Sequence, residues 1–148
     1  MAKKKKKARQ KDEFASSETG SELERWQQAH RLAIGVPVNE LARSLQELLT
    51  RQLTTRIAGV KDGQTVTRWV SGEITDIRNI EVEQRLRTAY EIAQILLVSD
   101  QPSTVKAWFI GPNPLLSDSS PVDAIGAGQF KETISAAKAF GGVTATTS

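Results

Sequence analysis

The chain has 148 residues, of which 39% are hydrophobic and 25% are charged, values that are ordinary for a globular protein. This length holds one compact domain, or two very small domains that share a core. The chain has no cysteine, which excludes disulfides, thiolate metal sites and thiol nucleophiles, and its single histidine, His30, excludes a histidine-rich metal site.

Basic residues are concentrated at the N-terminus. Residues 1–20 contain seven Lys or Arg and three Asp or Glu, which leaves 13 of the 20 basic and 14 of the 17 acidic residues for the remainder. We expect this segment to be disordered, because it has too little apolar surface to offset the loss of chain entropy on ordering. Lys3–Lys7 is either a solvated tail or an arm attracted to DNA phosphates. No signal peptide or run of about 20 apolar residues is visible, so we expect a cytoplasmic protein without membrane contact.

The remainder has the periodicity of helices. Apolar residues recur every three or four positions and strand-like alternation is absent, so the sequence predicts an all-α fold. Helices are expected at residues 21–33, 39–51, 53–59, 64–70, 76–98, 103–109, 122–125 and 129–140. The predicted organisation is a tail at 1–20, a helical region with a helix-turn-helix at 21–73 and a second helical domain at 74–148.

Capping residues and helix breakers place the predicted boundaries. Ser21, Asn39, Ser103 and Ser120 are suitable N-caps, and either Asp62 or Gly63 can cap the helix that follows. Gly35 with Pro37, Gly72, and the pair Gly141-Gly142 are expected to end the helices before them. His30 is expected to be a surface or packing residue, because no neighbour in the sequence would orient it as a base.

Residues 53–70 have the order of a DNA-reading helix-turn-helix. Gly59 suits a turn with positive φ, and Val66 and Trp69 are predicted to anchor the second helix. Its free face would then present polar side chains able to contact bases or phosphates: Gln64, Thr65, Thr67 and Arg68. The alternative is a helical packing unit that has lost DNA binding, which the small net charge of residues 39–73 favours. Arg68-Trp69-x-x-Gly72 resembles the second helix of Xre-type helix-turn-helix modules.

The most distinctive stretch is Trp108-Phe109-Ile110-Gly111-Pro112-Asn113-Pro114-Leu115-Leu116, an aromatic pair that runs into a rigid loop. Ser120-Pro121-Val122-Asp123 and a last helix that starts near Phe130 follow it. This order resembles the toxin-binding domain of Xre/MbcA/ParS-type antitoxins. The resemblance covers roughly residues 40–140 and includes neither the lysine tail nor residues 21–38.

The resemblance implies an antitoxin that blocks the active site of a RES-domain toxin, an enzyme that degrades NAD⁺, and that represses its own operon. It implies operator DNA and the toxin as partners and a homodimer within a larger complex. The residues carried over as toxin-binding, or as the scaffold for it, are Trp108, Asn113, Pro114, Leu115, Pro121, Asp123, Phe130, Ile134 and Phe140. The contacts themselves are expected from the exposed face of 129–140, on which Ala136 is predicted to lie, and from residues 141–148.

Two other functions compete with the antitoxin. A stand-alone regulator would keep the same fold without a toxin. An enzyme is disfavoured, because the sequence lacks a catalytic triad, paired carboxylates and metal-ligand spacing, and Gly59-x-x-x-Gly63 lacks the Lys-Ser/Thr of a phosphate loop. We therefore expect no catalytic residue, metal, cofactor or small-molecule substrate.

Overall fold

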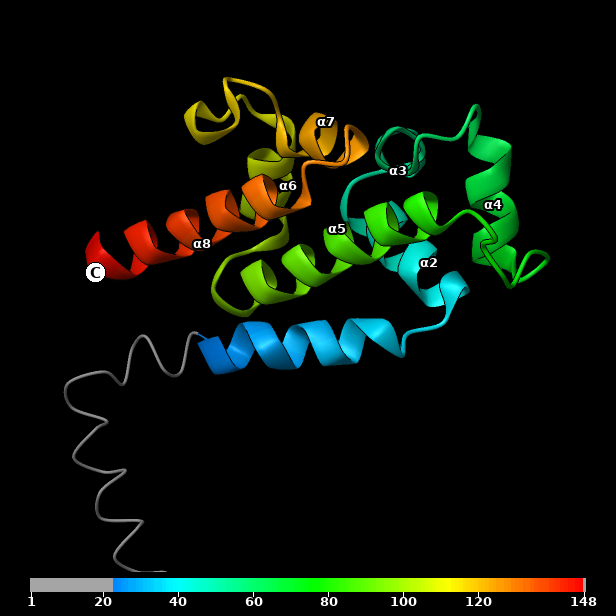
Figure 1. Ribbon diagram of the computed structural model, residues 1–148, viewed down its shortest axis with the longest axis horizontal. Coiled ribbons are helices and arrows are strands. Elements are labelled where there is room, and N and C mark those ends of the chain that lie inside the picture. The colour runs from blue at the N-terminus through cyan, green and yellow to red at the C-terminus, as the bar shows by residue number, and fades with distance from the viewer. Residues whose placement is uncertain (1–22, 148) are drawn as a thin grey trace, which may run out of the picture.

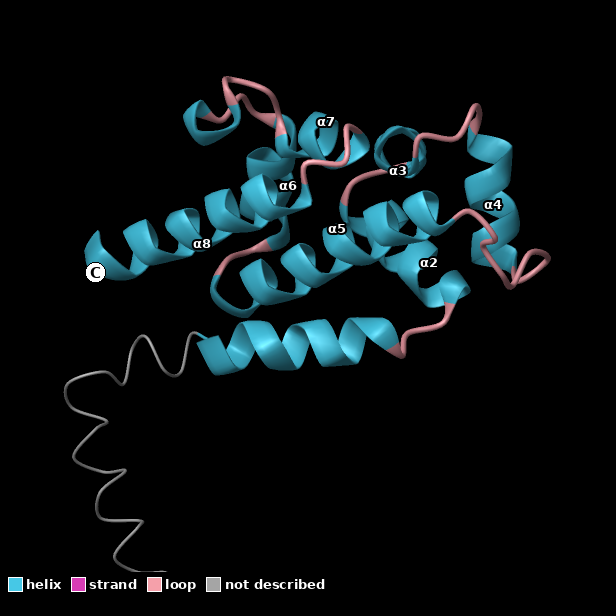
Figure 2. Cartoon of the chain, viewed as in Figure 1, coloured by secondary structure: helices cyan, strands magenta, loops and turns pink. Residues whose placement is uncertain are grey.

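The computed structural model describes the backbone of residues 23–147 and the side chains of residues 23–141. Every regular element in this part of the chain is helical, as predicted (Figure 2). A helix over 23–34 precedes the others, and the remaining elements are α2 (Val38–Leu48), α3 (Arg51–Ala58), α4 (Gly63–Ser71), α5 (Ile80–Ser99), α6 (Pro102–Ile110), η1 (Pro114–Leu116), α7 (Pro121–Gly126) and α8 (Phe130–Thr147). The predicted tail and the Ser21 cap lie outside the described residues.

Helix α5 is the centre of the fold, and α2, α3, α6, α7 and α8 all pack against it. The N-terminal helix (residues 23–34) runs beside α5, while α4 and the C-terminal end of α8 lie at opposite ends of the molecule (Figure 1). Buried side chains from Trp26 to Ala137 form one continuous hydrophobic cluster. Residues 21–73 and 74–148 therefore contribute to the same core. No described helix is long and apolar enough to cross a membrane.

Two arginines of α5 hold the ends of other helices. The Arg85 guanidinium donates a hydrogen bond to the carbonyl of Ala58, the last residue of α3. The Arg87 guanidinium donates to the carbonyls of Ala33 and Val36, at the end of the N-terminal helix. A helix leaves its last carbonyls without intrahelical partners, and these arginines supply donors to the carbonyls of Ala33 and Ala58. Helix α5 thus fixes the ends of two earlier helices.

Several predicted boundaries are confirmed. The N-terminal helix ends at residue 34, just before Gly35. Asp62 caps α4 by accepting a hydrogen bond from the Gln64 N–H at 3.0 Å, and Ser120 caps α7 by accepting from the Asp123 N–H at 3.1 Å. Gly72 ends α4 with φ of 84°. These motifs act through neighbouring residues, which is why they are visible in the sequence.

The boundaries of α2 and α3 differ from those predicted. Pro37 precedes the first residue of α2, so Asn39 lies inside the first turn instead of capping it. Helix α2 ends at Leu48, because Thr50 leaves the helical conformation with φ of 136°. The Thr50 hydroxyl then accepts a hydrogen bond from the Leu53 N–H and caps α3. Helix α2 therefore begins without a side-chain cap, whereas α3 begins at a capping threonine.

Three later boundaries were also predicted wrongly. Asn79 caps α5 by accepting from two backbone N–H groups, so this helix begins at Ile80 and not at residue 76. Helix α6 begins at Pro102, not at the predicted Ser103 cap. Helix α8 continues through the glycine pair to Thr147. Gly141 is not among the positive-φ glycines, and a glycine ends a helix by adopting that conformation.

Tyr90 of α5 is half-buried near α2. Burial and the negative charge of Glu40 both raise the pKa of the Tyr90 hydroxyl above 10.0, its ordinary value. Both effects disfavour the phenolate, since burial removes its hydration and the carboxylate repels it. The side chain therefore stays neutral across the neutral pH range.

Candidate nucleic-acid and partner interfaces

Helices α3 and α4 form a tight two-helix unit. Gly59 follows α3 with φ of 75°, in the left-handed region that favours glycine. A Cβ at Gly59 would also lie 3.0 Å from Nη1 of Arg85, so the turn needs glycine for both its dihedral angle and its space. Val66 and Trp69 of α4 are buried, Trp69 to 3% exposure, as the sequence indicated. Helix α4 is thereby anchored along one side.

The other side of α4 carries the polar residues proposed from the sequence to contact DNA. Gln64, Thr67 and Arg68 are exposed, and Thr65 is half-buried. Arg68 has Glu73 near its guanidinium, with Nε and Oε2 3.9 Å apart. Three of the four predicted side chains therefore lie on one exposed surface, and Thr65 is less accessible.

Sequence reasoning missed a fifth residue at this surface, Arg51. Its Nη1 donates a hydrogen bond of 3.1 Å to the Thr67 hydroxyl, which brings the first residue of α3 against α4. A Cβ at Gly63 would lie 2.8 Å from the Arg51 Nε. Arg51 and Thr67 are 16 positions apart, so no local sequence pattern could have revealed the contact.

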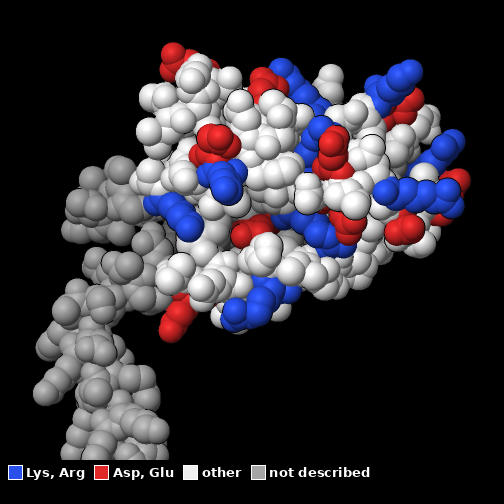
Figure 3. Space-filling model, viewed as in Figure 1, with Lys and Arg blue, Asp and Glu red and all other residues white. Residues whose placement is uncertain are grey.

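Charges of both signs cover the end of the molecule where α4 lies. Lys61, Arg51 and Arg68 are exposed there, with Asp62 and Glu73 among them. Figure 3 shows basic side chains gathered at this end, interspersed with acidic ones. The surface is weakly basic in net terms, so any DNA binding by it would depend on where individual cations are placed.

The aromatic pair of the C-terminal motif is part of the core. Trp108 and Phe109 are buried, with their ring centroids 5.2 Å apart in an edge-on arrangement, and Phe140 of α8 packs 6.1 Å from Trp108. Asn113 caps η1 by accepting a hydrogen bond from the Leu115 N–H at 2.9 Å. These residues have scaffold positions, which was one of the two roles that the resemblance left open.

The loop between α6 and α7 exposes apolar side chains. Ile110 is 48% exposed and Leu115 is 62% exposed, and Pro114 is also exposed. Ser117 and Asp118 both take left-handed backbone conformations, which fold the loop back so that the Asn113 carbonyl accepts from the Asp118 N–H. The end of α6 and this loop therefore each present one aliphatic side chain, and the loop backbone is held by its own hydrogen bonds.

Helix α7 connects the two candidate regions. Pro121 is buried, and Asp123 forms an ion pair with Arg56 of α3, with Nε and Oδ1 2.7 Å apart. A Cβ at Gly126 would lie 3.2 Å from the Arg56 carbonyl, so the helices approach closely at this point. Helix α3 of the predicted helix-turn-helix and helix α7 of the predicted second domain are thus in direct contact.

Helix α8 packs its apolar stripe inward. Phe130, Ile134 and Phe140 are half-buried against the core, whereas Ala136 is only 1% exposed. The expectation that Ala136 lies on the exposed face is wrong, because Ala136 lies about one turn after buried Thr133, on the same side of the helix. The outward residues of α8 are instead polar: Lys131, Glu132, Ser135 and Lys138.

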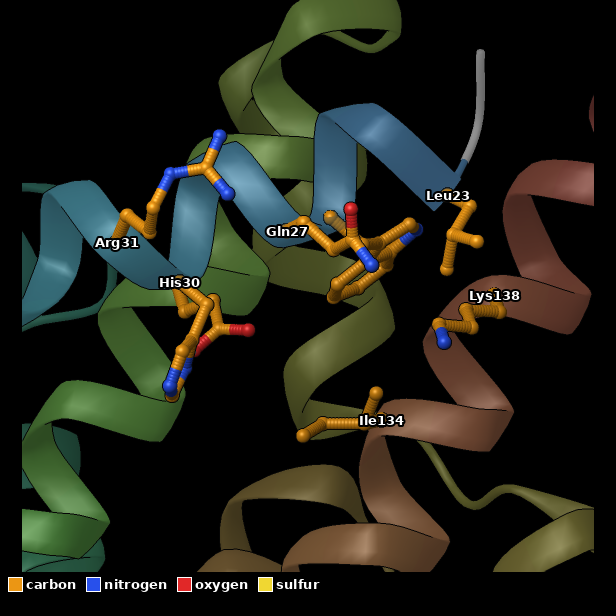
Figure 4. Close-up of a pocket in the computed structure, with 8 residues that line it drawn as sticks. Leu23, Gln27, His30, Arg31, Ile134 and Lys138 are labelled. Atoms are coloured by element: carbon orange, nitrogen blue, oxygen red, sulfur yellow. The ribbon is translucent and has the colours of Figure 1, made fainter. Parts of the chain in front are cut away.

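An open groove of about 460 Å³ lies between the N-terminal helix, α5 and α8. Figure 4 shows Ile134 and Lys138 facing the N-terminal helix across it. His30 Nδ1 lies 3.0 Å from Oε1 of the buried Glu91, so the expectation that nothing orients His30 is wrong. The residues that line the groove include no hydroxyl that a His–Glu pair could activate: Leu23, Trp26, Gln27, His30, Arg31, Glu91, Ile134 and Lys138.

The groove is partly filled by the chain's own contacts. The Lys138 ammonium lies 5.5 Å from the centroid of the Trp26 ring, within the range of a cation–π interaction. Within residues 23–147, no group of three His, Asp or Glu side chains could hold a metal ion.

We found no match between this chain and known protein families, curated proteins or solved structures. A function therefore has to be inferred from the sequence and geometry of the chain itself.

Proposed function

We propose that this protein is a DNA-binding antitoxin, which represses its own operon through α3 and α4 and neutralises a partner toxin through its C-terminal half. The observation that carries the DNA-binding part is the two-sided character of α4. Its Val66 and Trp69 are buried, and its Gln64, Thr67 and Arg68 are exposed on the opposite side. A helix that follows a tight turn with one face anchored and the other polar is suited to entering the major groove of DNA.

The partner in this proposal is a RES-domain toxin that consumes NAD⁺, on the strength of the sequence resemblance. Exposed Ile110 at the end of α6 and Leu115 on the loop that follows support a protein interface in the C-terminal half, because exposed aliphatic side chains on a constrained backbone lose little entropy on binding. This loop and α4 lie toward opposite ends of the molecule (Figure 1), so DNA and toxin could be bound together.

A stand-alone regulator is the second candidate, and the surface of α8 favours it. Its apolar stripe is used by the protein's own core, and its outward side chains are polar. Protein interfaces usually contain buried apolar or aromatic anchors, and the outward face of α8 has none between residues 130 and 141, where its side chains are described. Under this alternative, α8 completes the fold and contacts no toxin.

Co-expression of the full-length chain with the product of the adjacent gene, followed by pull-down and measurement of cellular NAD⁺, separates the two functions. We expect complex formation and preserved NAD⁺. Leu115→Glu should weaken the complex, because the new charge would be buried against the partner. Ser135→Glu on the polar face of α8 is the matched control. Absence of any complex, with DNA binding intact, would favour the stand-alone regulator.

A further inference from the structure

We infer that Arg51 is a DNA phosphate contact, which fixes how α4 sits on the duplex. This inference rests on the proposed DNA binding by α4 and extends it to a residue of α3. Arg51 is exposed, and its guanidinium lies beside the Thr67 hydroxyl on the polar side of α4. A single cation from the preceding helix thus stands next to the side chains proposed to face the bases.

The charge of Arg51 is not compensated within the fold. The other arginines of helices α3, α4 and α5 have carboxylates near them, as Arg56 has Asp123 and Arg68 has Glu73, and only Arg78, between α4 and α5, shares with Arg51 the lack of one in this described part of the chain. Among the described residues no carboxylate forms an ion pair with Arg51, and its guanidinium donates one hydrogen bond, to the neutral Thr67 hydroxyl. The remaining N–H groups of this guanidinium are free for an anion, and a planar guanidinium suits the oxygens of a phosphate.

Glycine at position 63 leaves space for the Arg51 guanidinium but makes the first turn of α4 less stable. Gly63 is the first residue of α4, and its φ is not positive, so the backbone conformation there does not require glycine. Glycine is unfavourable in a helix because it loses more backbone freedom than other residues on folding. A Cβ at this position would lie 2.8 Å from Nε and 3.1 Å from Cδ of Arg51. Gly63 therefore lets Arg51 approach the first turn of α4.

Structural stabilisation does not account for this arrangement. The hydrogen bond between Arg51 and Thr67 is exposed to solvent, where such contacts contribute little to folding. An exposed cation without a carboxylate, held against the first turn of the candidate recognition helix, is what binding to the sugar–phosphate backbone requires. Arg51 would set the register of α4, and Gln64 and Arg68 would then read the bases.

The test compares four variants for binding to a fluorescein-labelled duplex from the region upstream of the coding sequence, by fluorescence anisotropy over a range of salt concentrations. Arg51→Ala should bind about fivefold more weakly at 0.15 M salt and about thirteenfold more weakly at 0.05 M, and its salt slope should fall by about 0.9, the value for one lost phosphate contact. Thr67→Val should weaken binding less. Arg56→Ala, a second exposed arginine of α3, should bind like the wild type.

Gly63→Ala separates a phosphate contact from a structural role. Its Cβ should displace the guanidinium and weaken DNA binding, while the melting temperature stays level or rises because alanine favours the helix. A parallel loss of melting temperature and affinity would overturn the inference. Equal affinity and salt slope for wild type and Arg51→Ala would also overturn it while leaving DNA binding by α4 intact. A wild-type chain that binds no duplex would instead refute the proposed function itself.

Discussion

Trp69 anchors α4 to the core, so truncating it should unfold the surface proposed to bind DNA. The indole is 3% exposed. Burial of roughly 150–200 Å² of aromatic surface at about 25 cal/mol per Å² corresponds to roughly 4–5 kcal/mol. Partial collapse of the resulting cavity widens the expected cost of Trp69→Ala to about 3–5 kcal/mol. For a chain of this size the melting temperature should fall by roughly 10–20 °C.

Urea unfolding followed by far-ultraviolet circular dichroism measures this loss without depending on tryptophan fluorescence. Trp69→Phe keeps an aromatic ring in the cavity and should lose less stability, which keeps the prediction testable if the alanine variant does not fold. Arg68→Ala, on the exposed side of the same helix, should change stability by no more than about 0.5 kcal/mol. A Trp69→Ala variant with an unchanged midpoint and no DNA binding would show that the indole contacts DNA and does not support the helix.

The other predictions concern backbone conformation, titration and burial. Gly59→Ala should destabilise the protein by about 1–2 kcal/mol or more in thermal unfolding, because alanine is strained at positive φ and would crowd Arg85. Gly72→Ala has the same backbone strain but open space around the new Cβ, so it should destabilise the protein less. The raised pKa of Tyr90, the only tyrosine, means that the native state holds the phenolic proton more tightly than the unfolded chain. Stability should therefore fall as the pH rises above 10, and Tyr90→Phe should remove that dependence; a tyrosinate absorbance titration with a midpoint at 10 in the native protein would contradict it. Ala136→Glu should lose about 3 kcal/mol or more in urea unfolding because its charge would be buried, whereas Ser135→Glu should be tolerated; equal stability of the two would contradict the placement of α8.

Local chemistry explains which features could be predicted from the sequence. Asp62, Gly59 and Ser120 were assigned correctly because a cap or a left-handed turn acts within a few residues. The buried pair Val66 and Trp69 followed from helical spacing for the same reason. The boundaries at Thr50 and Asn79 were missed because several capping residues compete near each helix start, and tertiary packing decides between them.

The contacts that define the candidate surfaces could not be predicted. Arg51 with Thr67, Arg56 with Asp123 and His30 with Glu91 join residues that are 16, 67 and 61 positions apart. Each depends on how two helices cross, which hydrophobic periodicity does not determine. The burial of Ala136 could not be predicted for a related reason. Periodicity identified the apolar stripe of α8 but not how far the core extends around the helix.

The position of the N-terminal helix affects how the chain can fold during synthesis. This helix is made first, yet the carboxylate that pairs with its histidine is translated 61 residues later, and Ile134 and Lys138 follow nearer the C-terminus. At about 5–20 residues per second, the helix waits roughly 3–12 s on the ribosome before Glu91 has been made, and longer before α8 is complete. Trp26, 7% exposed in the folded protein, lies beside Lys138 of α8. The surroundings of this aromatic side chain are therefore completed only when α8 has been made.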